Sequence, residues 1–139
     1  RTWDGVDGSN GWGPNGWAGL DGAPLPMQVF VLTHEGREAV TRGKTTFTFV
    51  TQGLERAREQ AKAAAGDRNV YLMGANIAQQ CLKAGYLDEI VLHLVPVLLT
   101  EGIRLFDQLG TQPIELERTE VIEAPGVIHL RFRVVRKGL

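Results

Sequence analysis

"NVYLMGANIAQQCLKAGYLDE", residues 69–89, contains the change of pattern that decides the fold. Residues 69–73 are mostly apolar and predict a buried strand, whereas the pattern from Asn76 onward is helical. Gly74 and Ala75 are the small residues between the two. A strand, a small-residue turn and a helix start together place free backbone N–H groups and the positive end of a helix dipole at one point, which is how proteins hold phosphate. The stretch therefore predicts an anion site at this turn.

A second interpretation of Gly74 stays open, because a small residue between a strand and a helix is also required for tight packing in many folds. The helix is predicted over residues 76–84, and Gly85 supplies its stop. Asn76 is expected to cap the first turn when no anion is bound. The side chains predicted to face inward are those of Ile77, Cys81 and Leu82, and Cys81 is most simply a small core residue.

Three short apolar runs and one helical stripe give the rest of the architecture. Strands are predicted at residues 28–33, 45–50 and 69–73, and the helical stripe between the last two has its stop at Gly66. Another strand is predicted at residues 89–99, followed by a hairpin whose strands flank Pro125-Gly126, a pair that suits a type II turn. The predicted fold class is α/β: a three-layer fold with a mixed, mainly parallel sheet, helices on both faces and a C-terminal antiparallel hairpin.

Length and composition predict a single domain over residues 1–139. The 43% hydrophobic and 22% charged residues are ordinary for a globular protein, and a net charge of −1 favours neither nucleic acid nor a membrane surface as a partner. Cys81 is the single cysteine, so an internal disulfide is excluded and a reducing cytoplasm is the simplest location. The three histidines lie too far apart in sequence to indicate a metal site. Residues 4–26 are glycine-rich and predict a loop.

Ligands of open α/β sheets bind at the carboxyl ends of the parallel strands. Three such ends are Thr33-His34, Val50-Thr51-Gln52 and Gly74 to Ile77, and all three are suited to one ligand. Arg37 adds a positive charge nearby, although an exposed loop arginine is the simpler interpretation. The G-x-G-x-x-G fingerprint and the P-loop motif are both absent from the sequence.

Most of the chain after residue 27 resembles the dihydrofolate-reductase-like family that includes the C-terminal reductase domain of bacterial riboflavin-biosynthesis proteins. The most specific similarities are Gly74-Ala75-Asn76 before a helix, "AGYLDEIVLHLVPVLL" at residues 84–99 and "GIRLF" at 102–106. "RTWD" at residues 1–4 also resembles a family segment that lies well inside the domain. The resemblance thus implies that a first strand and helix precede Arg1.

The resemblance further implies an NADPH-dependent oxidoreductase that transfers hydride to a small heterocyclic substrate of pterin or pyrimidine type, and a homodimer. The catalytic residues stay unknown at this stage, and no metal is expected. The residues implied to bind the cofactor are Thr33, His34 and Arg37 at the 2'-phosphate and ribose, Val50 and Thr51 at the adenine, Gly74, Ala75, Asn76 and Ile77 at the pyrophosphate, and Thr100, Glu101 and Gly102 on the nicotinamide side.

Two positions depart from the family pattern. Met73 stands where relatives usually have the first of two glycines, and Thr100-Glu101 replaces a glycine-rich turn. Both changes add a Cβ atom where glycine leaves space for a cofactor. They motivate an alternative, in which the chain is a non-catalytic dinucleotide-binding or assembly domain that keeps the fold. His93, in the middle of its strand, is expected to be partly exposed or to face a dimer partner.

Overall fold

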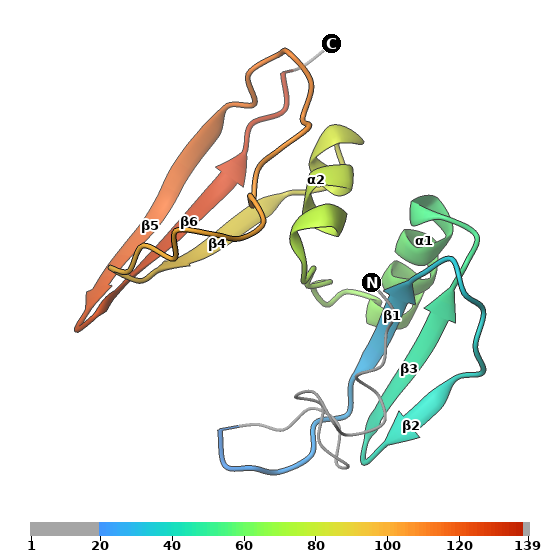
Figure 1. The fold of residues 1–139 in the computed structure, drawn as a ribbon. Helices are drawn as coiled ribbons and strands as arrows, with labels where there is room; N and C mark the ends of the chain where they lie inside the picture. Colours follow the sequence, from blue (N-terminus) through green and yellow to red (C-terminus); the bar gives the residue numbers. More distant parts are fainter. Residues whose placement is uncertain (1–19, 138–139) are drawn as a thin grey trace. The chain divides into compact units, whose positions relative to one another are not determined.

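The structure, a computed structural model, describes residues 20–137. The chain divides into two compact units, Arg1–Val70 and Tyr71–Leu139, and each is described by itself (Figure 1). Most of the predicted glycine-rich loop, residues 4–26, lies outside the described residues. Residues 20–26 form a turn and extended chain that lead into the first strand.

The first unit contains a three-stranded sheet and one helix. Its elements are β1 (Gln28–Leu32), β2 (Val40–Arg42), β3 (Thr45–Val50) and α1 (Leu54–Ala65). The strand order is β1-β3-β2, in which β1 runs parallel and β2 antiparallel to β3. The sequence did not predict β2, which is only three residues long and joins β3 through a turn at Gly43, whose φ is 57°.

The core of this unit forms around the central strand β3. Phe47 is fully buried between its partners Val29 on β1 and Val40 on β2. Thr45 is equally buried, and its hydroxyl donates a hydrogen bond to the carbonyl oxygen of Leu25 at 3.2 Å. Such a bond offsets the desolvation that an unpaired buried hydroxyl would suffer. Helix α1 packs against β1, and its predicted stripe is half-buried except at Ala64, which is exposed. Gly66 ends the helix with a φ of 60°, as predicted.

The second unit contains one helix and an antiparallel sheet. Its elements are α2 (Ala75–Lys83), β4 (Glu89–Leu94), β5 (Leu116–Ala124) and β6 (Val127–Val134), and the strand order is β4-β6-β5. The prediction of the helix is confirmed to within one residue at each end. Gly85 follows its end with a φ of 73°, and the buried side chains are Cys81 and Leu82.

The predicted C-terminal hairpin is confirmed. Ala124 pairs with Val127 across Pro125-Gly126, and Gly126 has the positive φ, 75°, that a type II turn requires at its third residue. A bulge in β5 leaves Thr119 out of the pairing, and its hydroxyl bonds the carbonyl oxygen of Arg131 at 3.2 Å.

Two expectations about strands are wrong. The described residues contain a single parallel pair, β1 with β3, and every other strand pair is antiparallel, so the sheet pairings are not mainly parallel. The strand predicted at residues 69–73 is not formed. A strand buried on both faces needs neighbours to bond its N–H and C=O groups, and residues 69–73, which cross the boundary between the two units, pair with no strand of the described residues. Their side chains are accordingly exposed, up to 80% at Tyr71.

Strand β4 is also shorter than predicted. It ends at Leu94 rather than at residue 99. Pro96 has no N–H group to donate to a sheet, and the chain turns there, with the Val97 N–H bonding the Val95 carbonyl oxygen at 2.8 Å. The apolar residues that follow, such as Leu98 and Leu99, are therefore exposed.

Candidate functional site

The parallel strands of the first unit end side by side. Leu32 on β1 is level with Val50 on β3, and the N–H of Thr33 donates a hydrogen bond to the carbonyl oxygen of Val50 at 3.1 Å. The structure thus brings two of the predicted strand ends together. The side chain of Val50 is only 2% exposed, so it could meet a ligand only through its backbone.

The loop after β1 folds over the end of β3. The hydroxyl of Thr33 accepts a bond from the N–H of Glu35 at 3.2 Å, which makes a tight turn. A Cβ atom added to Gly36 would lie 3.8 Å from Cγ2 of Thr51, so the loop and Thr51 are neighbours. His34 is exposed on this loop, while Arg37 forms an ion pair with Glu35 at 3.6 Å. The loop therefore offers polar groups to a ligand, but a carboxylate already accompanies its arginine.

The N-terminus of the predicted helical stripe, which the sequence analysis did not consider as a binding feature, lies directly after this edge. Gly53 precedes α1 with a φ of 92° and provides no side-chain cap. The first-turn N–H groups of a helix have no partner within the helix. The signal was a glycine directly before the start of the helical stripe, the same signal that drew attention to Gly74.

Gly74 directly precedes α2 and has a backbone conformation that few other residues adopt. Its φ is 107° and its ψ is 137°, and no side chain caps the helix. A Cβ atom placed on Gly74 would meet no described atom within 4 Å. The glycine is thus required by its backbone conformation and not by close packing, which removes the packing interpretation for the described residues. The turn leaves open space beside the N-terminus of α2.

Asn76 does not cap this turn, so that expectation is wrong. It is the second residue of the helix, and its side-chain oxygen accepts a hydrogen bond from the amide of Gln80 one turn later. The helix begins at Ala75, one residue earlier than predicted, so Asn76 is too far along to cap it. Ala75 and Ile77 are half-buried on either side of it.

The turn at residues 100–102 is the second unusual backbone of this unit. Thr100 has a φ of 61° and Gly102 a φ of 149°. A β-branched residue at positive φ is a genuine outlier. All three residues of this turn, Thr100, Glu101 and Gly102, are exposed. Thr100 therefore has a backbone conformation that is typical of glycine.

Gln79 is a residue of the site that the sequence analysis missed. Its side-chain amide donates hydrogen bonds to the carbonyl oxygens of Arg104 and Leu105, at 2.9 and 3.0 Å. These bonds attach the "GIRLF" segment to α2, one turn after the Gly74 entry. A polar residue on a half-buried helix face, 25 residues away from its partners, gave no local signal.

The predicted cofactor residues fall into two groups. Thr33, His34, Arg37, Val50 and Thr51 belong to the first unit, and Gly74 to Ile77 with Thr100 to Gly102 belong to the second. The structure brings members of the first group together as described above, whereas the approach of residues 74–77 to residues 100–102 and the joining of the two groups stay predictions. Two carboxylates in this part of the chain, Glu101 and Asp107, are both exposed.

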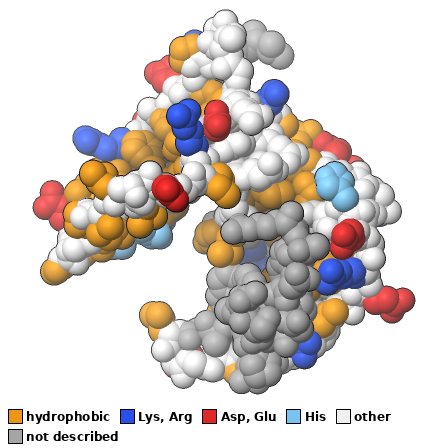
Figure 2. Space-filling view, in the orientation of Figure 1, with side chains coloured by type: hydrophobic (Ala, Val, Ile, Leu, Met, Phe, Trp, Pro, Cys, Tyr) orange, Lys and Arg blue, Asp and Glu red, His pale blue; other side chains and the backbone are white. Residues whose placement is uncertain are grey.

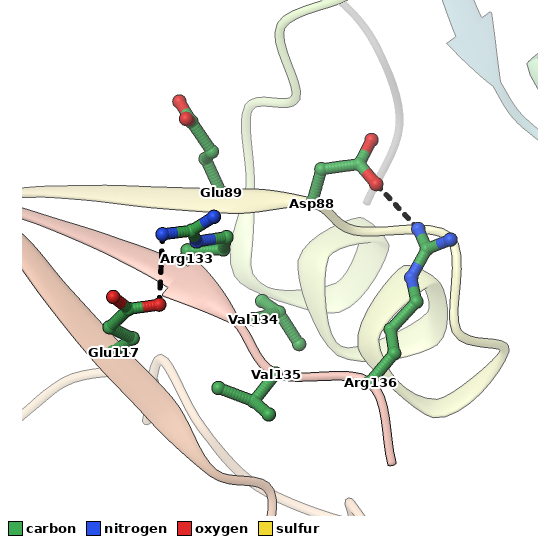
Figure 3. Close-up of a pocket in the computed structure, with 7 residues that line it drawn as sticks. All are labelled: Asp88, Glu89, Glu117, Arg133, Val134, Val135 and Arg136. Carbon is green, nitrogen blue, oxygen red and sulfur yellow. Dashed lines mark hydrogen bonds and ion pairs between the residues drawn. The ribbon is translucent and has the colours of Figure 1, made fainter. Parts of the chain in front are cut away.

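A hollow in the second unit lies away from these residues. Figure 3 shows it lined by side chains from the ends of β4, β5 and β6. Arg133 pairs with Glu117 at 2.9 Å, and Arg136 pairs with Asp88. Because both arginines already have carboxylate partners, the hollow offers little free charge to a ligand, and we do not assign it a role.

Comparison with solved structures identifies the fold class of this chain. Two solved structures share the mixed α/β fold. One, from Shewanella sp. PV-4 and described as a riboflavin biosynthesis protein, is 23% identical, with a TM-score of 0.65 over 78% of this chain and 61% of its own. The other, a pyrimidine reductase-like protein from Corynebacterium diphtheriae, is 19% identical, with a TM-score of 0.53 over 68% of this chain and 40% of its own.

The family follows from the sequence. Residues 10–130 match the RibD C-terminal domain, so the chain belongs to the RibD C-terminal domain family. Human stabilin-1 is 27% identical over 111 residues, which are 80% of this chain and 4% of stabilin-1. The chain therefore spans only a small part of that relative. Within residues 20–137, no helix is both long enough and apolar enough to cross a bilayer.

Proposed function

We propose that this chain is a single domain that binds NADPH and reduces a small heterocyclic substrate of pterin or pyrimidine type. Membership of the RibD C-terminal domain family supports the proposal, as does the fold shared with a pyrimidine reductase-like protein. The observation that carries it is the entry to α2, where Gly74 leaves open space beside an uncapped helix N-terminus. Such a turn lets a pyrophosphate approach backbone N–H groups.

The proposal assigns the parts of the dinucleotide to two groups of residues. In the second unit, Gly74 to Ile77 would hold the pyrophosphate, while Thr100, Glu101 and Gly102 would border the nicotinamide. In the first unit, Thr33, His34 and Arg37 would meet the 2'-phosphate and ribose, and Thr51 with the backbone of Val50 would border the adenine. When bound, NADPH supplies the hydride from C4 of its nicotinamide. The chain's own part is to orient the two reactants and to keep water from them.

The finer arrangement of the fold, with three layers and helices on both faces, is part of this proposal. A cytoplasmic location agrees with the single, buried cysteine, Cys81, which has no second cysteine to form an internal disulfide.

Calorimetric titration with NADPH tests the proposal directly. We expect saturable binding of one NADPH per chain and weaker binding of NADH, which lacks the 2'-phosphate. Failure of the folded, full-length protein to bind NADPH at millimolar concentration would refute it.

The alternative is a non-catalytic domain that keeps the fold. The observation in its favour is Met73, which directly precedes Gly74 and is 65% exposed. Its side chain takes up space that a glycine at this position would leave for a cofactor. A Met73→Gly variant separates the two possibilities, and Tyr71→Gly is the matched control for added backbone freedom in the same segment. A sharp gain in NADPH affinity for Met73→Gly alone would favour the non-catalytic domain, whereas an unchanged, tight affinity favours the enzyme.

We also propose that the chain forms a homodimer. Figure 2 shows hydrophobic side chains gathered over one face of the sheet of the second unit. The exposed members of the apolar face are Leu94, Leu116, Val121 and Ile128, which come from all three of its strands. A second copy is the simplest symmetric cover for such a face. Light scattering at micromolar concentration tests this, and a monomer would contradict it.

A further inference from the structure

Two histidines that are 36 positions apart in sequence face each other on the sheet of the second unit. His93 on β4 lies directly opposite His129 on β6. Their Nδ1 atoms are 2.7 Å apart. The ring centroids are 4.9 Å apart, and the ring planes meet at 77°. Sequence distance concealed this pair, because antiparallel pairing alone brings the two residues together.

The short contact means that both Nδ1 atoms are directed at one small region. It is a hydrogen bond only when one ring carries a proton at Nδ1 and the other presents a lone pair there. When both neutral rings carry their proton at Nε2 instead, the two Nδ1 lone pairs point to the same place. Imidazole nitrogen is the commonest protein ligand of transition metals. We propose that His93 and His129 form a two-imidazole binding site for a divalent transition-metal ion.

The separation of the two nitrogen atoms is close to what a shared ion needs. With metal–nitrogen bonds of about 2.05 Å, two ligands at a right angle lie about 2.9 Å apart, whereas two ligands at the tetrahedral angle lie about 3.3 Å apart. The 2.7 Å between the two Nδ1 atoms is a hydrogen-bond distance, so the rings must separate by a few tenths of an ångström to hold an ion. Ni²⁺ and Cu²⁺ stand high in the affinity order of divalent ions for nitrogen ligands and are therefore suitable probes.

The charges around the pair do not oppose a cation. On the same face, β4 presents Glu89, β6 presents Arg131, and β5 presents Glu120. The guanidinium of Arg131 lies 3.4 Å from a carboxylate oxygen of Glu89 and 3.5 Å from one of Glu120, so two negative charges accompany one positive charge. The neighbour of His129 on β5 is the apolar Ile122.

The described residues supply only two ligands, the two imidazoles, to a bound ion. Among the described residues, no third histidine, cysteine or carboxylate joins them in a group that could hold a metal. Water would fill the remaining positions of the ion. The site is therefore exchangeable, and it exists only where β4 and β6 are paired in this register. Bound metal should consequently stabilise the folded sheet.

Ni²⁺ alone is the first probe, since Cu²⁺ can oxidise the thiol of Cys81. Tag-free, full-length protein titrated with Ni²⁺ by calorimetry should bind one ion per chain. His93→Ala and His129→Ala should each lower the affinity tenfold or more. His34→Ala is the matched control, because it removes the third histidine, which lies in the other unit, and it should retain the wild-type affinity. Wild-type affinity in His93→Ala, or an equal loss in His34→Ala, would overturn the proposal.

A second measurement does not depend on any variant. Ni²⁺ should raise the midpoint of thermal unfolding of the wild-type protein, and Mg²⁺, which prefers oxygen ligands, should not. The rise should disappear in acid, where protons compete for the imidazole nitrogens. An equal shift with Mg²⁺, or a shift with Ni²⁺ that persists in acid, would show that the histidine pair is not the site.

Discussion

Helices α1 and α2 are each preceded by a glycine, but the segments before the two glycines differ. Gly53 and Gly74 have φ values of 92° and 107°, and neither helix has a side-chain cap. Before Gly53 lies β3, paired on both edges, whereas the segment before Gly74 has no strand partners among the described residues. A turn of this kind is encoded locally by its glycine, while a strand exists only where neighbours bond it.

The largest expected effect comes from adding a Cβ atom at these two entries. Gly53→Ala and Gly74→Ala should each lower the free energy of unfolding by about 1–3 kcal/mol, because both place a side chain in a sparsely populated backbone region. Urea denaturation measures the loss. Gly36→Ala is the control, since Gly36 has no positive φ and its added Cβ would make only an ordinary contact.

The same variants distinguish the entries by ligand affinity. Measured where each protein is fully folded, Gly74→Ala should lower NADPH affinity about tenfold or more, equivalent to about 1.4 kcal/mol. Gly53→Ala should leave the affinity nearly unchanged. Equal losses of affinity at the two glycines would show that the entry to α2 is not the particular site of the pyrophosphate.

The comparison also explains how far the sequence could predict the fold. The helix after Gly74, the glycine stops at Gly66 and Gly85, and the hairpin at Gly126 were all predicted, because each depends on residues close together in the chain. The strand at 69–73 was not predicted correctly, since an apolar run gives no information about whether partner strands are present. The site was predicted in the same uneven way: the Gly74 turn has a local signal, whereas the bonds of Gln79 and the pairing of His93 with His129 depend on distant residues.

A smaller effect is expected at the turn of Thr100, where a β-branched residue takes a glycine-like φ of 61°. Thr100→Gly should stabilise the protein by up to about 1 kcal/mol, because the relief of strain exceeds the added freedom of the unfolded chain. Denaturant midpoints measure the change. Glu101→Gly is the control, since Glu101 has no positive φ to relieve, and it should be neutral or destabilising. A destabilised Thr100→Gly would mean that the threonine side chain contributes more than its backbone conformation costs.

The smallest expected effect is electrostatic and concerns the loop after β1. Glu35 lies 3.6 Å from Arg37, and both side chains are largely solvent-exposed, so the ion pair itself contributes little to stability. A bound 2'-phosphate would nevertheless be repelled by that carboxylate. Glu35→Gln should therefore raise NADPH affinity about two- to fivefold at low ionic strength, and the gain should shrink in about 1 M salt, where the Debye length is near 3 Å. NADH affinity should not change, because NADH has no 2'-phosphate. Glu59→Gln, which removes the same charge from an ion pair with Arg56 on α1, is the matched control. A gain for NADH as large as that for NADPH would place the 2'-phosphate away from Arg37.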